Sequence, residues 1–155
     1  MIDNPPQLID NFAGLVIFDI AGKEFCADIK DVSAIINPSE MDQLITDNVK
    51  NNSSITVNNI VIPLIDVRKI FGLNIKPKTN DIRILIVEFG TRAYGFVVEK
   101  VKEILTMSKE LKINMEFKAF KNEPYLLGIL HFEGRTFYLP DFKNLYQNKI
   151  DDEKL

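Results

Sequence analysis

The chain has 155 residues, a formal net charge of −3 and 46% hydrophobic residues, a composition typical of a soluble globular protein and not of a disordered tail. Because the basic residues are scattered, no stripe is present that could neutralise a run of phosphates, and we expect no nucleic-acid partner. The polar N-terminus lacks the features of a signal peptide, no apolar run is long enough to span a bilayer, and the lone cysteine allows no internal disulfide. We therefore expect a cytoplasmic protein without direct membrane insertion.

The first elements in chain order are β-strands. Leu15–Ile20 and Glu24–Ile29 are apolar runs on either side of the turn Ala21-Gly22-Lys23, which predicts a hairpin. Pro38–Ile45 is a candidate helix, and Asn48–Ser54 has the composition of an exposed loop.

Further hairpins and short helices follow. Ser54–Val57 and Ile60–Ile65 flank Asn58-Asn59, a two-residue turn because asparagine tolerates the left-handed region. Asp66 and Asp141 each precede a short helical pattern, which indicates that they cap helices. The remaining predicted strands are Ile84–Phe89, Ala93–Val98, Leu126–Phe132 and Thr136–Leu139.

The chain contains an internal repeat. Leu15–Ile35 aligns without gaps with Ile84–Ile104 at a constant offset of 69 residues, and Ile62–Phe71 resembles Phe137–Tyr146 at an offset of 75. The repeat predicts a single domain over residues 12–148, with one lobe at about 12–75 and a second at about 81–148. Each lobe is small for a free-standing core, so we expect the two to share an apolar seam. Residues 1–11 and 149–155 are expected to be flexible termini.

The sequence offers little catalytic chemistry. His131 is the only histidine and Cys26 the only cysteine, too few for a structural metal site, and Cys26 stands in an apolar run without a charged neighbour to activate it. The glycines form no nucleotide-binding loop. The paired aspartates Asp66 and Asp141 are better explained as helix caps than as an aspartic dyad. We expect no enzyme, no metal and no cofactor.

Several stretches together resemble a known family. Ile60–Arg68 is similar to the apolar-Pro-apolar-apolar-Asp-Leu-Arg stretch of the CheW-like proteins, and Leu15–Phe18, Gly90–Val98 and Tyr125–Gly128 match other segments of that family in order. The resemblance covers about residues 14 to 146. It implies a mostly β fold of two pseudo-symmetric SH3-like five-stranded β-barrels packed side by side, with short helices. It also implies a non-catalytic adaptor of chemotaxis, which binds the regulatory domain of a CheA-type histidine kinase and the cytoplasmic tip of chemoreceptors.

The chain departs from the family pattern at three places, all in the first lobe, one of which is the Gly- and Pro-bearing approach to the hairpin turn, replaced here by Asn48–Ser54. The family turn Asn-Leu-Arg-Gly is replaced by Thr56-Val57-Asn58-Asn59, which lacks the arginine implicated in receptor coupling. The family stretch Val-x-Glu-Ile is replaced by Val32-Ser33-Ala34-Ile35, which lacks the acid. We interpret these positions as a remodelled partner surface, in an adaptor for a divergent pathway or one that no longer couples receptors. Its predicted binding residues are Val32, Ala34, Ile35, Asn58 and Asn59.

Two other classes of function remain open at this point. Eleven Phe and four Tyr would suit a small-ligand-binding β-barrel protein that uses the groove between the lobes, although the same aromatics are better explained as filling two small cores. An enzyme with a cryptic site would require a pocket that brings His131 together with an acid or with Cys26.

Overall fold

The computed structural model describes residues 8–38, 54–67, 71 and 81–153. The described chain is mostly β, as predicted, and forms two sheets of six and five strands. The larger sheet has one strand more than the five expected in each barrel, because β9 is added at its edge. In spatial order it contains β8 (Lys100–Thr106), β1 (Gly14–Ile20), β2 (Lys23–Asp28), β11 (Arg135–Pro140), β10 (Leu126–Phe132) and β9 (Glu116–Ala119). The smaller contains β3 (Ala34–Ile36), β6 (Arg83–Phe89), β7 (Arg92–Val98), β5 (Ile60–Asp66) and β4 (Ser54–Val57).

The helices that lie wholly within the described residues are η1 (Leu8–Asn11), η2 (Ile29–Asp31), α2 (Lys109–Ile113) and α3 (Phe142–Glu153), and all but α3 are short. The predicted cap of α3 is confirmed, because the Asp141 carboxylate accepts a hydrogen bond from the Asn144 N–H at 3.1 Å. The helix continues well past Tyr146, where the sequence pattern placed its end. The predicted helix at Pro38–Ile45 lies almost entirely outside the described residues.

The described end of the N-terminal segment is packed. Residues 1–11 were predicted to be a flexible terminus, but within residues 8–11 the helix η1 buries Ile9 against the core of the larger sheet. The short pattern of Leu8, Ile9 and Phe12 among polar residues is too brief to reveal such a contact from the sequence.

The hairpin turns follow the residues predicted for them. Ala21-Gly22, Asn58-Asn59 and Glu133-Gly134 all have positive φ at both positions, which is the type I′ geometry that matches the twist of the flanking strands. The pairs Ile20 with Lys23 and Val57 with Ile60 close two of these turns directly.

Strand pairing reproduces the sequence repeat residue by residue. In the first hairpin Ile17 pairs with Cys26, and at an offset of 69 Ile86 pairs with Gly95. The third strand of each repeat pairs at equivalent positions too, but with the first strand of the other repeat. Ile35 of β3 pairs with Leu85 of β6, and the equivalent Ile104 of β8 pairs with Val16 of β1.

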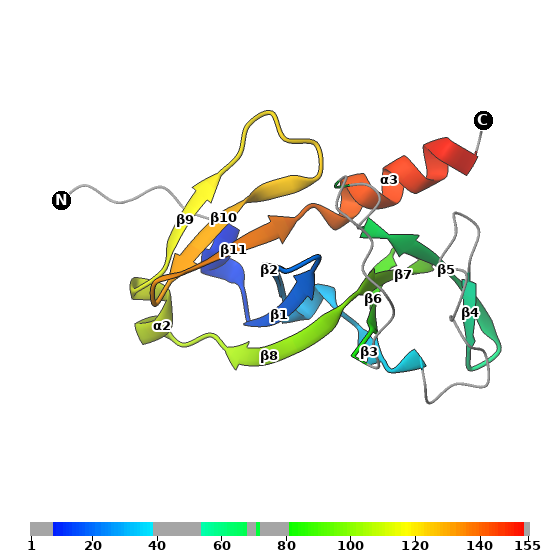
Figure 1. Ribbon diagram of the computed structural model, residues 1–155, viewed down its shortest axis with the longest axis horizontal. Coiled ribbons are helices and arrows are strands. Elements are labelled where there is room, and N and C mark those ends of the chain that lie inside the picture. Colours follow the sequence, from blue (N-terminus) through cyan, green and yellow to red (C-terminus); the bar gives the residue numbers. More distant parts are fainter. Residues whose placement is uncertain (1–7, 39–53, 68–70, 72–80, 154–155) are drawn as a thin grey trace.

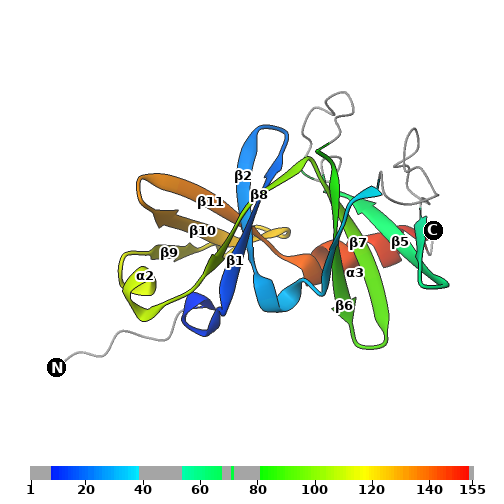
Figure 2. The same ribbon diagram turned by 90° about the horizontal axis from the view of Figure 1, so that it is seen from below.

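These reciprocal pairings exchange the two hairpins. The hairpin β1–β2 lies in the sheet completed by β8 to β11, whereas the hairpin β6–β7 lies in the sheet completed by β3 to β5 (Figure 1). The predicted limits 12–75 and 81–148 therefore delimit a repeat of the sequence, while each sheet combines strands from both halves of the chain. The second view separates the same two groups of strands (Figure 2).

The exchanged hairpins are buried on both faces. One face of each fills the core of its own sheet: Leu15 and Ile17 in the larger lobe, Ile84 and Ile86 in the smaller. The opposite faces meet in a third cluster, the seam, which contains residues of both hairpins. Its hairpin members are Val16, Phe18, Ile20, Phe25, Ala27, Leu85, Val87, Tyr94, Phe96 and Val98. This double burial explains why the hairpins are continuous apolar runs without alternation.

The C-terminal helix crosses from the larger sheet to the smaller lobe (Figure 1). Tyr146 of α3 stacks on Phe89 with ring centroids 4.4 Å apart and meets Tyr94 edge-on at 4.6 Å. At the equivalent position in the first repeat, Phe71 packs on Phe25 at 5.5 Å. Aromatic side chains after each closing strand therefore add to the seam from both sides.

Replacement of a seam residue should destabilise the whole molecule. We expect Leu85→Ala to lower the free energy of unfolding by about 2–5 kcal/mol, because Leu85 is fully buried and its loss leaves a cavity. The exposed Ile104→Ala on β8 is the matched control and should change stability by less than about 0.5 kcal/mol. Urea denaturation measures both, and equal losses in the two variants would contradict the seam.

Candidate docking surfaces

The predicted partner residues fall into two groups in the smaller lobe. Ala34 is exposed on β3, whereas Val32 and Ile35 are half-buried and pack against the seam. Asn58 and Asn59 are exposed at the turn between β4 and β5. β3 and β4 are the two edge strands of the five-stranded sheet, so the two groups of residues lie on strands that are not hydrogen-bonded to each other. Val32 and Ile35 pack β3 against the seam, whereas Ala34, Asn58 and Asn59 are exposed to a partner.

The hairpin β4–β5 carries an exposed apolar surface beside that turn. Ile60 is 62% exposed and Val61 63% exposed, values unusual for large apolar side chains next to each other. Residues 54–65 contain no charged side chain, although charged residues make up 26% of the chain. This surface was not predicted, because its apolar residues continue the pattern of a buried strand.

The larger lobe ends in a charged clasp, formed by Arg135, Glu24 and Glu103. The Arg135 guanidinium donates to Glu24 at 2.6 Å and to Glu103 at 2.9 Å, and it lies 4.8 Å from the ring centroid of Phe137. The hydrogen bonds to Glu24 and Glu103 raise the pKa of Arg135 above its ordinary value. The clasp thus ties β11 to β2 and β8, three strands that are far apart in the sequence.

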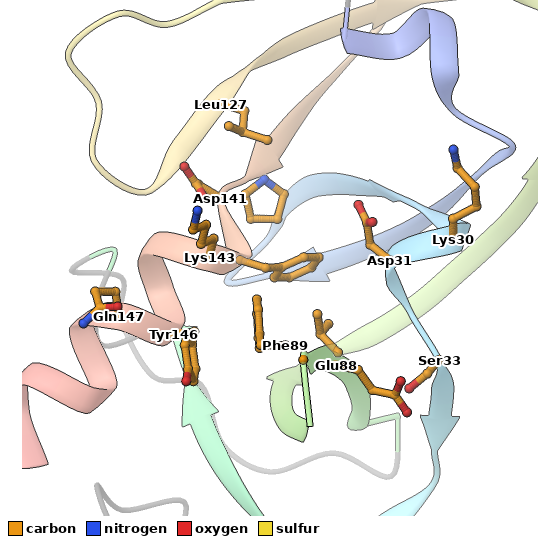
Figure 3. Close-up of a pocket in the computed structure, with 14 residues that line it drawn as sticks. Lys30, Asp31, Ser33, Glu88, Phe89, Leu127, Asp141, Lys143, Tyr146 and Gln147 are labelled. Carbon is orange, nitrogen blue, oxygen red and sulfur yellow. The ribbon is translucent and has the colours of Figure 1, made fainter. Parts of the chain in front are cut away.

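A hollow of about 650 Å³ lies between the two lobes. It is bounded by η2, the end of β6, the strands β10 and β11, and the first turns of α3 (Figure 3). Phe89 and Tyr146 form its apolar part, while Lys30, Asp31 and Lys143 bring charges of both signs. This hollow corresponds to the groove between the lobes that a small-ligand-binding protein of this fold would use. Its lining includes neither Cys26 nor His131.

The two residues that a cryptic active site would use are in different environments. Cys26 is buried in the core of the larger lobe, and burial raises the pKa of its thiol to about 12. His131 is exposed on β10, where its Nδ1 lies 2.9 Å from the Thr136 hydroxyl. Within the described ranges we find no group of three or more His, Cys, Asp or Glu side chains arranged to hold a metal, and no helix long and apolar enough to cross a membrane.

Comparison with known proteins identifies the family. The model of the CheW-like domain matches residues 14–149, almost the whole chain. The chain belongs to the CheW-like domain family. The two offset repeats and the paired sheets are therefore the family's two-lobed SH3-like fold.

Members of this family resemble the chain over most of its length. The chemotaxis protein CheW of Klebsiella aerogenes is 23% identical over 137 residues, which cover 86% of this chain and 81% of that protein. The chemotaxis protein CheW of Rhizobium meliloti is 21% identical over 136 residues, covering 87% and 88%. The crystal structure of the scaffolding protein TtCheW from Thermoanaerobacter tengcongensis superposes with a TM-score of 0.66 at 22% identity, covering 83% of this chain and 88% of that one.

The clasp should contribute modestly to stability and depend on salt. We expect Arg135→Met, which keeps an apolar stem over Phe137, to lower the free energy of unfolding by about 1 kcal/mol at low ionic strength. The loss should shrink in concentrated NaCl because the partly exposed ion pairs are screened. Exposed Arg92→Met is the control, and a loss independent of salt would show that the clasp acts by packing alone.

Cys26 should be inert in the folded protein. A thiol with a pKa of about 12 that is fully buried holds almost no thiolate at neutral pH, so labelling by a disulfide reagent should be at least about 100-fold slower than in the urea-unfolded chain. Above pH 9 the unfolded chain ionises this thiol while the folded chain does not, so the contribution of Cys26 to stability is lost as the pH rises. Rapid labelling of the native protein would contradict the burial of the Cys26 thiol.

Proposed function

We propose that the chain is a non-catalytic adaptor of a chemotaxis-type signalling system, acting in the cytoplasm and coupling a CheA-type histidine kinase to chemoreceptors. The observation that carries this proposal is the family match over residues 14–149, supported by CheW relatives that align over more than four fifths of the chain. The likeness to a scaffolding protein in fold agrees with it.

The fold suits a protein that works by binding alone. The seam fixes two lobes in one relative position, so the surfaces of both are presented to partners at a constant geometry. Pre-organised surfaces lose less conformational entropy on binding than mobile ones do.

We place the kinase regulatory domain on the smaller lobe at Ala34, and the cytoplasmic tip of a chemoreceptor at the Asn58-Asn59 turn. Both positions are exposed and both stand where the chain departs from the family pattern. Because the arginine that the family carries at this turn is implicated in receptor coupling and is replaced in this chain, we expect receptor binding to be weakened or lost.

A charge at Ala34 tests the kinase surface. We expect Ala34→Lys to weaken binding of the regulatory domain of the cognate kinase by at least about tenfold, because an ammonium group would be desolvated without a partner, at a position where the family carries an acid. Ala119→Lys is the matched control, since Ala119 is also an exposed alanine on an edge strand, β9, but in the other lobe. Isothermal titration calorimetry measures the affinity of each variant.

Three results of this titration are informative. Binding by the wild type and by Ala119→Lys with loss in Ala34→Lys supports the placement. Equal binding by all three moves the kinase to another surface. No binding by the wild type to the kinase domain or to a receptor cytoplasmic fragment would refute the adaptor function itself.

A further inference from the structure

The N-terminal arm, residues 8–13, is fastened to the larger lobe by its own apolar side chains and by neighbouring elements. Ile9 and Phe12 are buried in the core of that lobe. On the outside, the Lys112 ammonium of α2 donates a hydrogen bond to the Asp10 carbonyl at 2.7 Å. The arm is therefore a strap across the larger lobe, and its last residues are bonded to the end of β2 and to η2.

Two side chains at the junction of β2 and η2 hold the arm and η2 at the same time. Asp28 Oδ1 accepts hydrogen bonds from the Ala13 N–H at 3.0 Å and from the Lys30 N–H at 3.3 Å, and the second of these caps η2. Lys30 Nζ donates to the Asn11 carbonyl at 2.5 Å and lies 3.5 Å from Asp28 Oδ2. Asp28, at 4% exposure, is the one buried charged residue among the described residues, so its carboxylate depends on these donors.

The second repeat holds the equivalent segment in another conformation. At the offset of 69, Asp28 and Lys30 correspond to Val97 and Glu99, so neither of the two anchors is present there. Glu99 donates its N–H to the Asp19 carbonyl at 2.9 Å, and β8 begins at the next residue and pairs with β1. β8 consequently runs for seven residues, whereas β3, which follows η2, has three. The segment is a helical turn where the anchors exist and a strand where they do not.

The room for such a strand in the first repeat is the hollow between the lobes. By the same offset Lys30 would bond to the Glu88 carbonyl, and Asp31 would pair with Glu88. Within the described residues β3 pairs with β6 only between Ile84 and Ile86, and Lys30, Asp31 and Glu88 line the hollow instead (Figure 3). The like charges of Asp31 and Glu88 oppose that pairing, which favours η2 as long as the arm supports it.

We propose that the N-terminal arm controls a two-state segment, residues 29–33, which leads into the partner surface of β3. With the arm docked, the segment forms η2 and leaves the hollow open. With the arm released, it pairs with the end of β6, lengthens β3 and closes the hollow. Because Ala34 follows the segment directly, kinase docking belongs to the arm-docked form, a consequence that rests on the proposed function.

The shared anchors couple the arm to the segment. Release of the arm deprives Asp28 of the Ala13 N–H and Lys30 of the Asn11 carbonyl, so the two residues that stabilise η2 both lose a partner. A buried carboxylate with fewer donors is unfavourable, which raises the free energy of the helical form relative to the strand. The arm therefore shifts a population between two conformations of one segment.

A matched pair of substitutions in the arm tests the switch without altering residues 29–33. Ile9→Ser removes the anchor that is 2% exposed, whereas Leu8→Ser, at a neighbour that is 43% exposed, is the control. In NMR spectra of the full chain, Ile9→Ser should move the Cα shifts of residues 29–33 from helical to extended values. It should also produce cross-strand NOEs between Asp31 and Glu88. Leu8→Ser should leave the wild-type pattern unchanged.

A second variant reaches the same state from the other side of the contact. Asp28→Val gives the first repeat the residue that the second repeat carries at Val97, and it leaves the apolar anchors of the arm in place. We expect the same change to extended shifts. Because valine fills the buried position, this variant remains informative if Ile9→Ser loosens the core. Thermal melts establish that each variant is folded.

The affinity for the kinase reports the population of the arm-docked form. When fewer chains are in the form that binds, the apparent Kd rises in proportion. We expect Ile9→Ser and Asp28→Val to weaken binding of the cognate regulatory domain at least about fivefold in calorimetry. Leu8→Ser should stay within about twofold of the wild type.

Each outcome decides a separate point. Extended shifts in Ile9→Ser and Asp28→Val, with wild-type shifts in Leu8→Ser, support the switch. Helical or random-coil shifts for residues 29–33 in both folded variants refute it, whatever the kinase affinity. Extended shifts with unchanged kinase affinity refute the link between the arm and docking and leave the adaptor function standing. A wild type that binds no kinase domain refutes the proposed function, while the NMR result still decides the switch.

Discussion

The burial of two hairpins on both faces is the constraint on which the rest of the molecule depends. Each hairpin supplies one face to the core of a sheet and the other to the seam, so neither lobe has a complete core without strands from the opposite half of the chain. A hairpin alone is marginally stable in water, and a lobe of this size has little apolar surface to spare. The exchange therefore makes one cooperative unit from two small repeats and fixes the angle between their outer surfaces.

Much of this architecture was accessible from the sequence, because local and repeated signals agreed. The glycines and asparagines placed the turns, and the constant offset between Leu15–Ile35 and Ile84–Ile104 is matched in the structure by equivalent registers in the two hairpins. The exchange itself was not accessible. An offset between repeats is the same whether β1–β2 completes its own sheet or the other one, and the choice is made by packing against the distant strands β5 and β11.

The candidate surfaces were harder to predict than the fold. Ala34 and the Asn58-Asn59 turn stood out only by departure from a family pattern, and the structure leaves Val32 and Ile35 partly covered by the seam. The clasp gave no signal, since Glu24, Glu103 and Arg135 are ordinary surface residues in the sequence and meet only when three strands align. Ile60 and Val61 were hidden for the opposite reason, because exposed apolar residues on a strand look like core residues until their surroundings are known. Family membership supplies the class of function.

Native-state hydrogen exchange of the backbone amides of β1–β2 and β6–β7 is the most direct measurement of the central claim. If the seam joins the two hairpins into a single unit, their slowest amides should exchange with the same free energy of opening, equal to that of global unfolding. Slow exchange in one hairpin together with a separate, lower free energy of opening for the whole of the other would show that the lobes unfold independently, and would contradict a seam that makes them one cooperative unit.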